Sequence, residues 1–172
     1  MMLLLKILQK LVAALNSEGT PFQVAAGMAM GAALGLTPLM NVHNALIALV
    51  ALLVNVSLAG FFLGWTLLMP FGFVLDPLFD RIGSALLSAP ALRGLWTSLY
   101  NMPVVPYTNF NNSIVLGSLV FWLVMFVPIL LAAQYGVAKY RERVYARLAK
   151  TRFFGALKAS KVYQAYRLFH PD

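Results

Sequence analysis

The sequence contains no cysteine and none of the residue arrangements that usually carry enzymatic chemistry. Without cysteine there are no disulfides, no thiolate metal ligands and no cysteine nucleophile. There is no phosphate-binding glycine loop, no HExxH motif and no Ser-His-Asp set, and only two histidines occur, His43 and His170. We therefore expect that the protein is not an enzyme and that it has no catalytic residue, metal or cofactor.

Charged residues are scarce as well. They make up only 10% of the chain, whereas hydrophobic residues make up 61%. Residues 19–75 include no Lys, Arg, Asp or Glu. A soluble domain needs charged side chains on its surface, so this run indicates a lipid environment. The chain of 172 residues accommodates one domain. We predict an all-α membrane protein whose helical membrane domain covers residues 19–138.

The first part of the uncharged run predicts two short paired helices, over residues 20–36 and 42–55. The apolar segment 21–36 is only about 24 Å long as a helix, because an α-helix rises 1.5 Å per residue. Thr37-Pro38 interrupts the pattern after it. The two helices either cross the membrane separately or form a re-entrant pair, and the shortness of the second favours the re-entrant arrangement.

Glycines recur every four residues in this part of the chain. Helices in lipid associate through close approach of their backbones, which glycine permits. The spacing therefore marks five positions for helix packing: Gly27, Gly31, Gly35, Gly60 and Gly64. Such a ladder serves either a seam between two copies of the chain, which makes a homo-oligomer possible, or packing within one chain. The second interpretation is favoured, because a chain with several spans supplies its own partner helices.

Polar side chains gather where the two short helices meet. Polar groups within an apolar run are costly in lipid, so they are candidates for function. The candidates for contact with a ligand or a lipid are Thr37, Asn41, His43, Asn44 and Asn55. The alternative is that these side chains cap the second helix and satisfy the carbonyls of the turn.

Two longer spans are predicted over residues 57–75 and 112–138, the second with Pro128 as a kink. We expect Asp76-Pro77 to end the first of them, because the residue before a proline disfavours the helix. Residues 76–110 then form an amphipathic cap on one membrane face. Three charged residues of this cap are candidates for contact with a partner or for capping a helix start: Asp76, Asp80 and Arg81.

Amphipathic segments are also predicted at both ends. Residues 1–16 fit an interfacial helix better than a signal peptide, because Lys6 and Lys10 interrupt the apolar core. Residues 139–172 form a basic cytoplasmic tail, whose candidates for contact with the membrane surface are Lys139, Arg141, Arg143, Arg147, Lys150 and Arg152. Basic residues beside a span indicate anionic phospholipid rather than nucleic acid. Their position predicts that both termini are cytoplasmic, so the number of crossings is even.

Five segments carry a resemblance to a known family: ALNSEGTPFQVAAGMAMGAALGLTP, VHNALIALVALLVNVSLAGFFLGW, LDPLFDRIG, LWTSLYNMP and FNNSIVLGSLV. They are similar to an uncharacterised bacterial membrane family whose core is the domain of unknown function two thousand and sixty-two. The pattern residues at matching positions are Pro21, Gly27, Gly31, Pro38, His43, Asn44, Asn55, Asp76 and Pro77. The resemblance implies an inner-membrane location and a large envelope-spanning partner. It implies no catalytic residue, because the family has no agreed activity.

Two functional expectations follow from these patterns together. The first, which the resemblance implies, is an inner-membrane partner or anchor of an envelope-spanning protein, with a role in phospholipid transport to the outer membrane. The second is a transporter or channel for small solutes or ions, with a polar site in the broken helix at 37–44, because such breaks recur in transporter folds. A groove open to lipid beside this turn would favour the first, and a water-filled path would favour the second.

Overall fold

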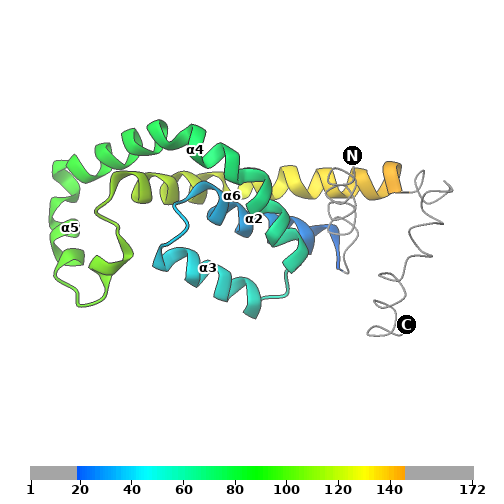
Figure 1. Cartoon of the computed structure of the whole chain (residues 1–172), viewed down its shortest axis with the longest axis horizontal. Coiled ribbons are helices and arrows are strands. Elements are labelled where there is room, and N and C mark those ends of the chain that lie inside the picture. Colours follow the sequence, from blue (N-terminus) through cyan, green and yellow to red (C-terminus); the bar gives the residue numbers. More distant parts are fainter. Residues whose placement is uncertain (1–18, 146–172) are drawn as a thin grey trace.

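The computed structural model describes residues 19–145, and this part of the chain is helical with no strand. The predictions for residues 1–16, Arg147, Lys150 and Arg152 lie outside the described residues. Two 3₁₀ turns, η1 (Pro90–Leu92) and η2 (Val105–Thr108), lie between the two longest helices of the chain, and a π-helical turn covers Tyr140–Tyr145. The α-helices are α2 (Pro21–Leu36), α3 (Val42–Leu53), α4 (Leu58–Ser88), α5 (Arg93–Tyr100) and α6 (Ser113–Lys139), as Figure 1 shows.

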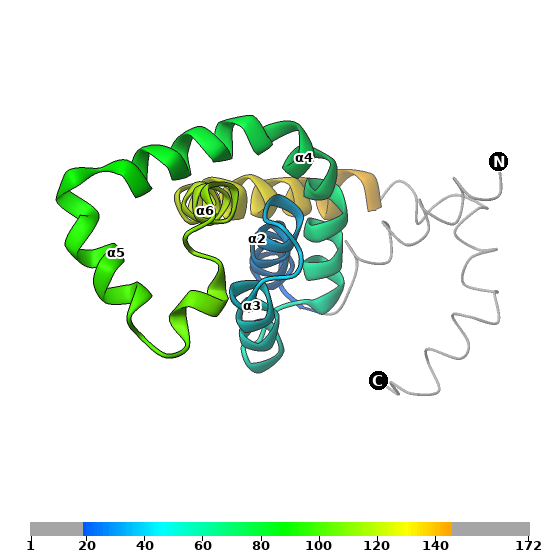
Figure 2. The same cartoon turned by 60° about the vertical axis from the view of Figure 1, so that its left-hand side comes forward.

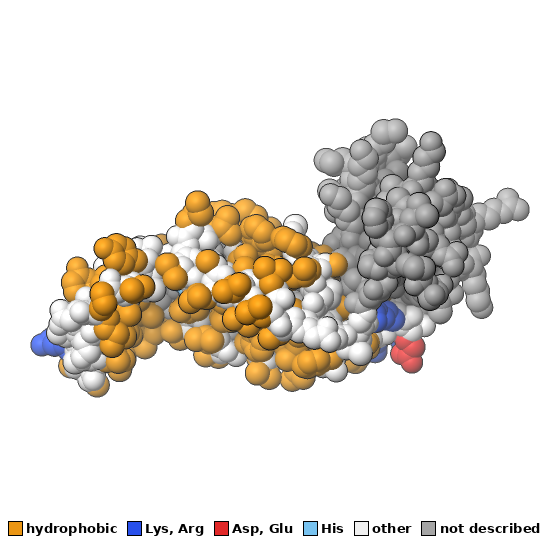
Figure 3. Space-filling model, turned by 90° about the horizontal axis from the view of Figure 1, so that it is seen from below, with side chains coloured by type: hydrophobic (Ala, Val, Ile, Leu, Met, Phe, Trp, Pro, Cys, Tyr) orange, Lys and Arg blue, Asp and Glu red, His pale blue; other side chains and the backbone are white. Residues whose placement is uncertain are grey.

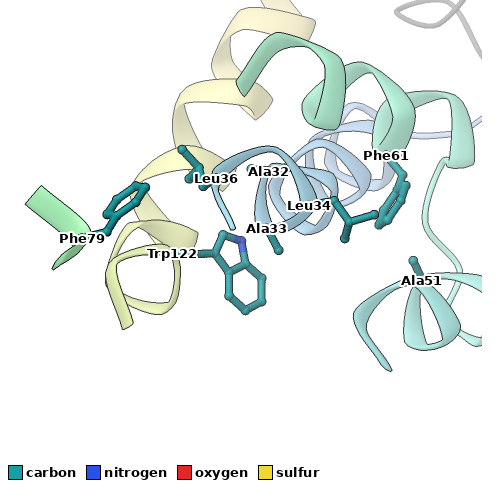
Figure 4. Packing of buried hydrophobic residues seen from close by; sticks show 8 residues of the cluster. All are labelled: Ala32, Ala33, Leu34, Leu36, Ala51, Phe61, Phe79 and Trp122. Carbon is teal, nitrogen blue, oxygen red and sulfur yellow. The ribbon is translucent and has the colours of Figure 1, made fainter. Parts of the chain in front are cut away.

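Helix α2 lies at the centre, between α4 and α6 (Figure 2). Its first turn forms because Thr20 and Gln23 make a capping box, in which each side chain bonds the other residue's backbone N–H, and because Pro21 suits the first helical position. Small residues let the neighbouring helices approach on all sides, so 11 of its 16 residues are buried. The Nε1 of Trp122 on α6 donates a hydrogen bond of 2.9 Å to the Ala29 carbonyl, and its ring packs beside α2 (Figure 4).

The three central helices have a defined direction. The start of α4 lies beside the start of α2, because the Ser57 N–H donates to the Gln23 carbonyl at 3.0 Å. Gly72 of α4 lies against the end of α2, so the two helices are parallel. Helix α3 follows α2 in the chain and leads back to the start of α4. Helix α6 is antiparallel to α2, since its end lies near the start of α2, where Arg141 donates to the Gly19 carbonyl at 2.8 Å.

Glycines hold α2 and α4 in backbone contact. A Cβ placed on Gly31 would lie 1.8 Å from the Phe61 carbonyl oxygen, and one on Gly64 would lie 2.1 Å from that of Met28. Gly27, Gly35 and Gly60 face the opposite backbone in the same way. The glycines are thus used for packing within one chain. A second contact of this kind, which the sequence analysis missed, joins α4 to α6 through Gly83 and Gly117.

Helix α4 is longer than expected, because it continues through Asp76-Pro77 to Ser88. The prediction that Asp76-Pro77 ends the span was wrong, and so was the expectation that Asp76 and Asp80 cap a helix start. A proline within a helix removes one hydrogen bond and bends the helix, but packing further along can offset that cost. Here the fully buried Phe79 and the Gly83 contact hold the second half of α4 on α6, and α4 curves around the other helices (Figure 2).

The outer surface is mostly apolar. Leu58–Ser88 and Ser113–Arg143 are long and apolar enough to cross a membrane, with mean hydropathies of 1.9 and 2.7. In an apolar stretch of 18 residues within each helix, only 28% is buried inside the protein, so most of these side chains need an apolar environment outside it. Hydrophobic side chains predominate among the coloured ones on one face, and charged side chains of the described residues are visible there only near the two ends (Figure 3). The prediction of an all-α membrane protein is confirmed.

Replacing Gly31 with alanine is expected to destabilise the protein in detergent. The added Cβ would overlap the Phe61 carbonyl, and overpacking of this kind costs about 1–3 kcal/mol of unfolding free energy. Gly136→Ala on α6 is the matched control, because nothing lies within 4 Å of the Cβ that it adds. Thermal unfolding of both variants checks the prediction. Equal midpoints would show that the glycine contact does not hold α2 against α4.

Candidate functional site

A cavity of about 530 Å³ lies at the end of α2, where the chain breaks before α3. Three separate parts of the sequence form its wall: the turn after α2, one face of α4, and the loop that leads into α6. The polar residues that line it are Thr37, Asn41, Asp76, Asn109 and Asn112, and the apolar ones include Leu36, Leu39, Met40, Trp65, Met69, Phe73, Ile114 and Val115. This volume lies within the usual range for small-molecule sites, which is roughly 300–1,000 Å³.

The turn beside the cavity is held by Thr37 and Asn44. Both side chains are buried, with 5% and 3% of their surface exposed. The Nδ2 of Asn44 donates to the carbonyls of Pro38 and Leu39, at 2.9 and 3.3 Å, and its Oδ1 lies 2.8 Å from the Thr37 hydroxyl. That hydroxyl also lies 2.8 Å from the Ala33 carbonyl. These bonds satisfy the backbone groups that the helix break releases, so Asn44 positions the turn rather than reaching into the cavity.

A second asparagine pair ties this turn to the loop before α6. Asn41 donates to the Pro38 carbonyl at 2.7 Å, and its Oδ1 accepts a bond of 3.0 Å from the Nδ2 of Asn109. Asn109 has a left-handed backbone with φ of 57°, which asparagine adopts more readily than most residues. Although Asn41 occupies the position before α3, its side chain does not cap that helix. The turn is therefore held both by Asn44 of α3 and by Asn109 of the loop before α6.

Asp76 and Asn112 bring unused polar groups to the cavity. The Oδ1 of Asn112 caps α6 by accepting the Val115 N–H at 3.1 Å, and this bond does not use the Nδ2 of the same amide as a donor. Neither this nitrogen nor the partly exposed Asp76 carboxylate has a hydrogen bond or an ion pair within the described part of the chain. The sequence patterns placed Asp76 in the predicted amphipathic cap and did not single out Asn112 as a contact residue.

Two predicted contact residues lie elsewhere. His43 is in the first turn of α3, does not line the cavity, and has a buried Nε2 without a partner among the described residues. Asn55 is exposed in the turn after α3, at the far end of that helix from Thr37. The structure therefore brings Thr37, Asn41 and Asn44 together, and leaves Asn55 apart from them.

The remaining charged candidates are separate from the cavity. The Asp80 carboxylate accepts a hydrogen bond from the Ser113 hydroxyl, and Arg81 is exposed on α4. Lys139 lies 4.3 Å above the Tyr135 ring, and Arg141 contacts Gly19. Lys139 ends α6 and Arg141 and Arg143 follow it, at the end of the molecule where α2 begins. The basic group and the cavity thus occupy opposite ends of α2.

Exposed apolar side chains border the cavity. Met40 has 90% of its surface exposed and Phe73 has 71%, and both belong to the cavity wall. A site lined by amide and carboxylate groups together with exposed apolar groups is suited to an amphipathic molecule. Water alone would leave these apolar side chains unfavourably exposed.

Asn44→Ala is expected to lower the thermal stability of the protein. The substitution removes the hydrogen bonds of Asn44 to the Pro38 and Leu39 carbonyls and to the Thr37 hydroxyl, and each such bond contributes about 0.5–1.5 kcal/mol of stability. Asn55→Ala is the control, because Asn55 is exposed and outside the turn. Thermal unfolding in detergent distinguishes the two. If Asn44→Ala keeps wild-type stability but loses ligand binding, Asn44 acts on the ligand and not on the turn.

Comparison with known proteins gives a family. A family described as "Uncharacterized protein conserved in bacteria (DUF2062)" matches residues 5–145. An uncharacterized protein of Treponema pallidum (strain Nichols) is 26% identical over 154 residues, which cover 88% of this chain and 93% of the relative. No solved structure matches the chain significantly. The resemblance carried by the five sequence segments is confirmed, and the chain belongs to the DUF2062 family.

Proposed function

We propose that this protein is a non-enzymatic inner-membrane component that binds phospholipid in the cavity at the end of α2 and acts with a large envelope-spanning protein in phospholipid transport to the outer membrane. The observation that carries the proposal is the composition of the cavity. Amide groups and one carboxylate line it, while Met40 and Phe73 expose apolar surface beside it. A phospholipid has matching parts, because its headgroup is polar and its acyl chains are apolar.

The distribution of charge supports an orientation in the membrane. The start of α2 and the end of α6 lie at one end of the molecule, where Lys139, Arg141 and Arg143 follow the apolar part of α6. Basic residues next to a span favour the cytoplasmic side, which also carries anionic lipid. The cavity then faces the periplasmic half of the membrane. Helix α5 and the 3₁₀ turns beside it offer exposed side chains on that side for a partner, including Leu95, Tyr100 and Tyr107.

A solute or ion transporter is supported less well. Such a protein needs a water-filled path between its helices, and polar side chains along that path. Here α2 and α4 touch through their backbones at Gly31 and Gly64, which leaves no room for water between them. The polar groups gather at one end of α2 instead, beside exposed apolar side chains.

Filling the cavity is expected to reduce the amount of bound phospholipid. Leu39→Trp adds a large ring at a residue of the cavity wall that is 47% exposed, so the fold can accept it. Leu49→Trp on α3 is the matched control, because Leu49 is 51% exposed and lies outside the cavity. Phospholipid that copurifies in mild detergent is measured per mole of protein. An equal lipid content in both variants, at equal thermal stability, would contradict binding in this cavity.

The orientation is tested separately. Reporter fusions at Lys10 and Arg167 are expected to report the cytoplasm, and a fusion near Pro90 is expected to report the periplasm, because basic residues flank the apolar helices at both ends of the chain. The readout is the activity of a reporter that works on one side of the membrane only. A cytoplasmic signal at Pro90 would contradict the predicted topology, in which both termini are cytoplasmic and the cavity end of the molecule is periplasmic.

A further inference from the structure

The unused polar groups of the cavity indicate which phospholipid headgroup it accepts. We propose that the cavity selects zwitterionic phospholipid with a primary ammonium group, which donates to the Asp76 carboxylate while the lipid phosphate accepts from asparagine amides. This inference rests on the proposed function and adds the chemical class of the headgroup. It depends on the charge of the cavity wall and on the donors that the fold leaves unused.

Among the described residues that line the cavity, Asp76 is the one ionisable side chain, and no Lys, Arg or His occurs there. Its carboxylate makes no hydrogen bond or ion pair with the described residues. Arg81 follows five residues later, which places it about 140° away around the helix at 100° per residue, on a different face. The cavity is therefore negative, and a headgroup with a positive charge is attracted to it.

Donors for a phosphate come from neutral amides. The Nδ2 of Asn112 has two protons and no partner in the described part of the chain. The Nδ2 of Asn41 uses one proton for the Pro38 carbonyl and the Nδ2 of Asn109 uses one for Asn41, so each retains another. Amides can hydrogen-bond a phosphate but cannot neutralise its charge. A lipid that brings its own cation offsets one of the two negative charges, which are those of its phosphate and of Asp76.

This composition disfavours the alternatives. An anionic lipid such as phosphatidylglycerol brings a phosphate without a cation, so it meets the Asp76 carboxylate as a like charge. A choline headgroup is positively charged but has no N–H, so it cannot donate a hydrogen bond to the carboxylate. A primary ammonium satisfies both the charge and the acceptor.

The test uses the full-length protein in detergent. Native mass spectrometry measures lipid bound from equimolar phosphatidylethanolamine, phosphatidylglycerol and phosphatidylcholine with the same acyl chains. The wild type is expected to bind phosphatidylethanolamine about tenfold more tightly than phosphatidylglycerol, since a charge-assisted hydrogen bond has this order of effect. Asp76→Asn keeps the size of the side chain and should abolish the preference. Asp76→Lys should reverse it in favour of phosphatidylglycerol.

Two further variants act as controls. Asp80→Asn makes the same change one turn away, outside the cavity wall, and should keep the preference. Asn112→Ser keeps a good helix cap and adds no charge but removes the amide donor, so it should weaken binding of all phosphate-bearing lipids. Thermal unfolding of each variant shows that it is folded.

The outcomes separate this inference from the proposed function. If the wild type binds no phospholipid, the proposed function fails. If it binds phosphatidylethanolamine and phosphatidylglycerol equally, or if Asp76→Asn keeps the preference, lipid binding stands and the headgroup assignment is wrong. Equal binding of phosphatidylcholine and phosphatidylethanolamine would also overturn the ammonium–Asp76 hydrogen bond.

Discussion

The contact between the backbones of α2 and α4 is the constraint on which the rest of the structure depends. In lipid there is little hydrophobic force between helices, so association relies on close packing. Gly31, Gly64 and their neighbours bring the two helices to a separation that no other residue permits. Because the helices are parallel, α3 must return the chain outside this contact, and the turn after α2 is placed beside α4. The position of the cavity follows from this arrangement.

Breaking a helix in an apolar environment releases backbone groups that need partners. Thr37 and Asn44 satisfy those groups, and Asn41 with Asn109 fastens the turn to a loop 68 residues away. Most of the polar character of the turn is thereby used for structure. The groups that remain available, on Asp76 and Asn112, come from other helices. A polar cluster in a membrane protein thus contains both residues that hold the backbone and residues that face the cavity.

The proposed function accounts for the relative positions of the cavity, the basic residues and the exposed apolar side chains. The cavity lies at one end of α2 and the basic residues at the other, and the long helices expose apolar side chains between them. A lipid headgroup bound at the cavity would keep its acyl chains against the apolar exterior. The curved second half of α4, with α5 beyond it, extends the molecule on the cavity side, where the proposed function places the partner.

The sequence by itself determined the class of the protein and the place where the first helix breaks, because charge content, glycine spacing and Thr37-Pro38 are local properties. It also marked five polar candidates, Thr37, Asn41, His43, Asn44 and Asn55, of which Thr37, Asn41 and Asn44 share hydrogen bonds at one turn. Only the tertiary structure decided that α4 continues past Pro77, because the packing of Phe79 and Gly83 on α6 outweighs a local preference. It likewise brought Asp76, Asn109 and Asn112 to the cavity and left Asn55 at the far end of α3. Such contacts join residues far apart in the chain, and no periodicity or spacing within one segment specifies them.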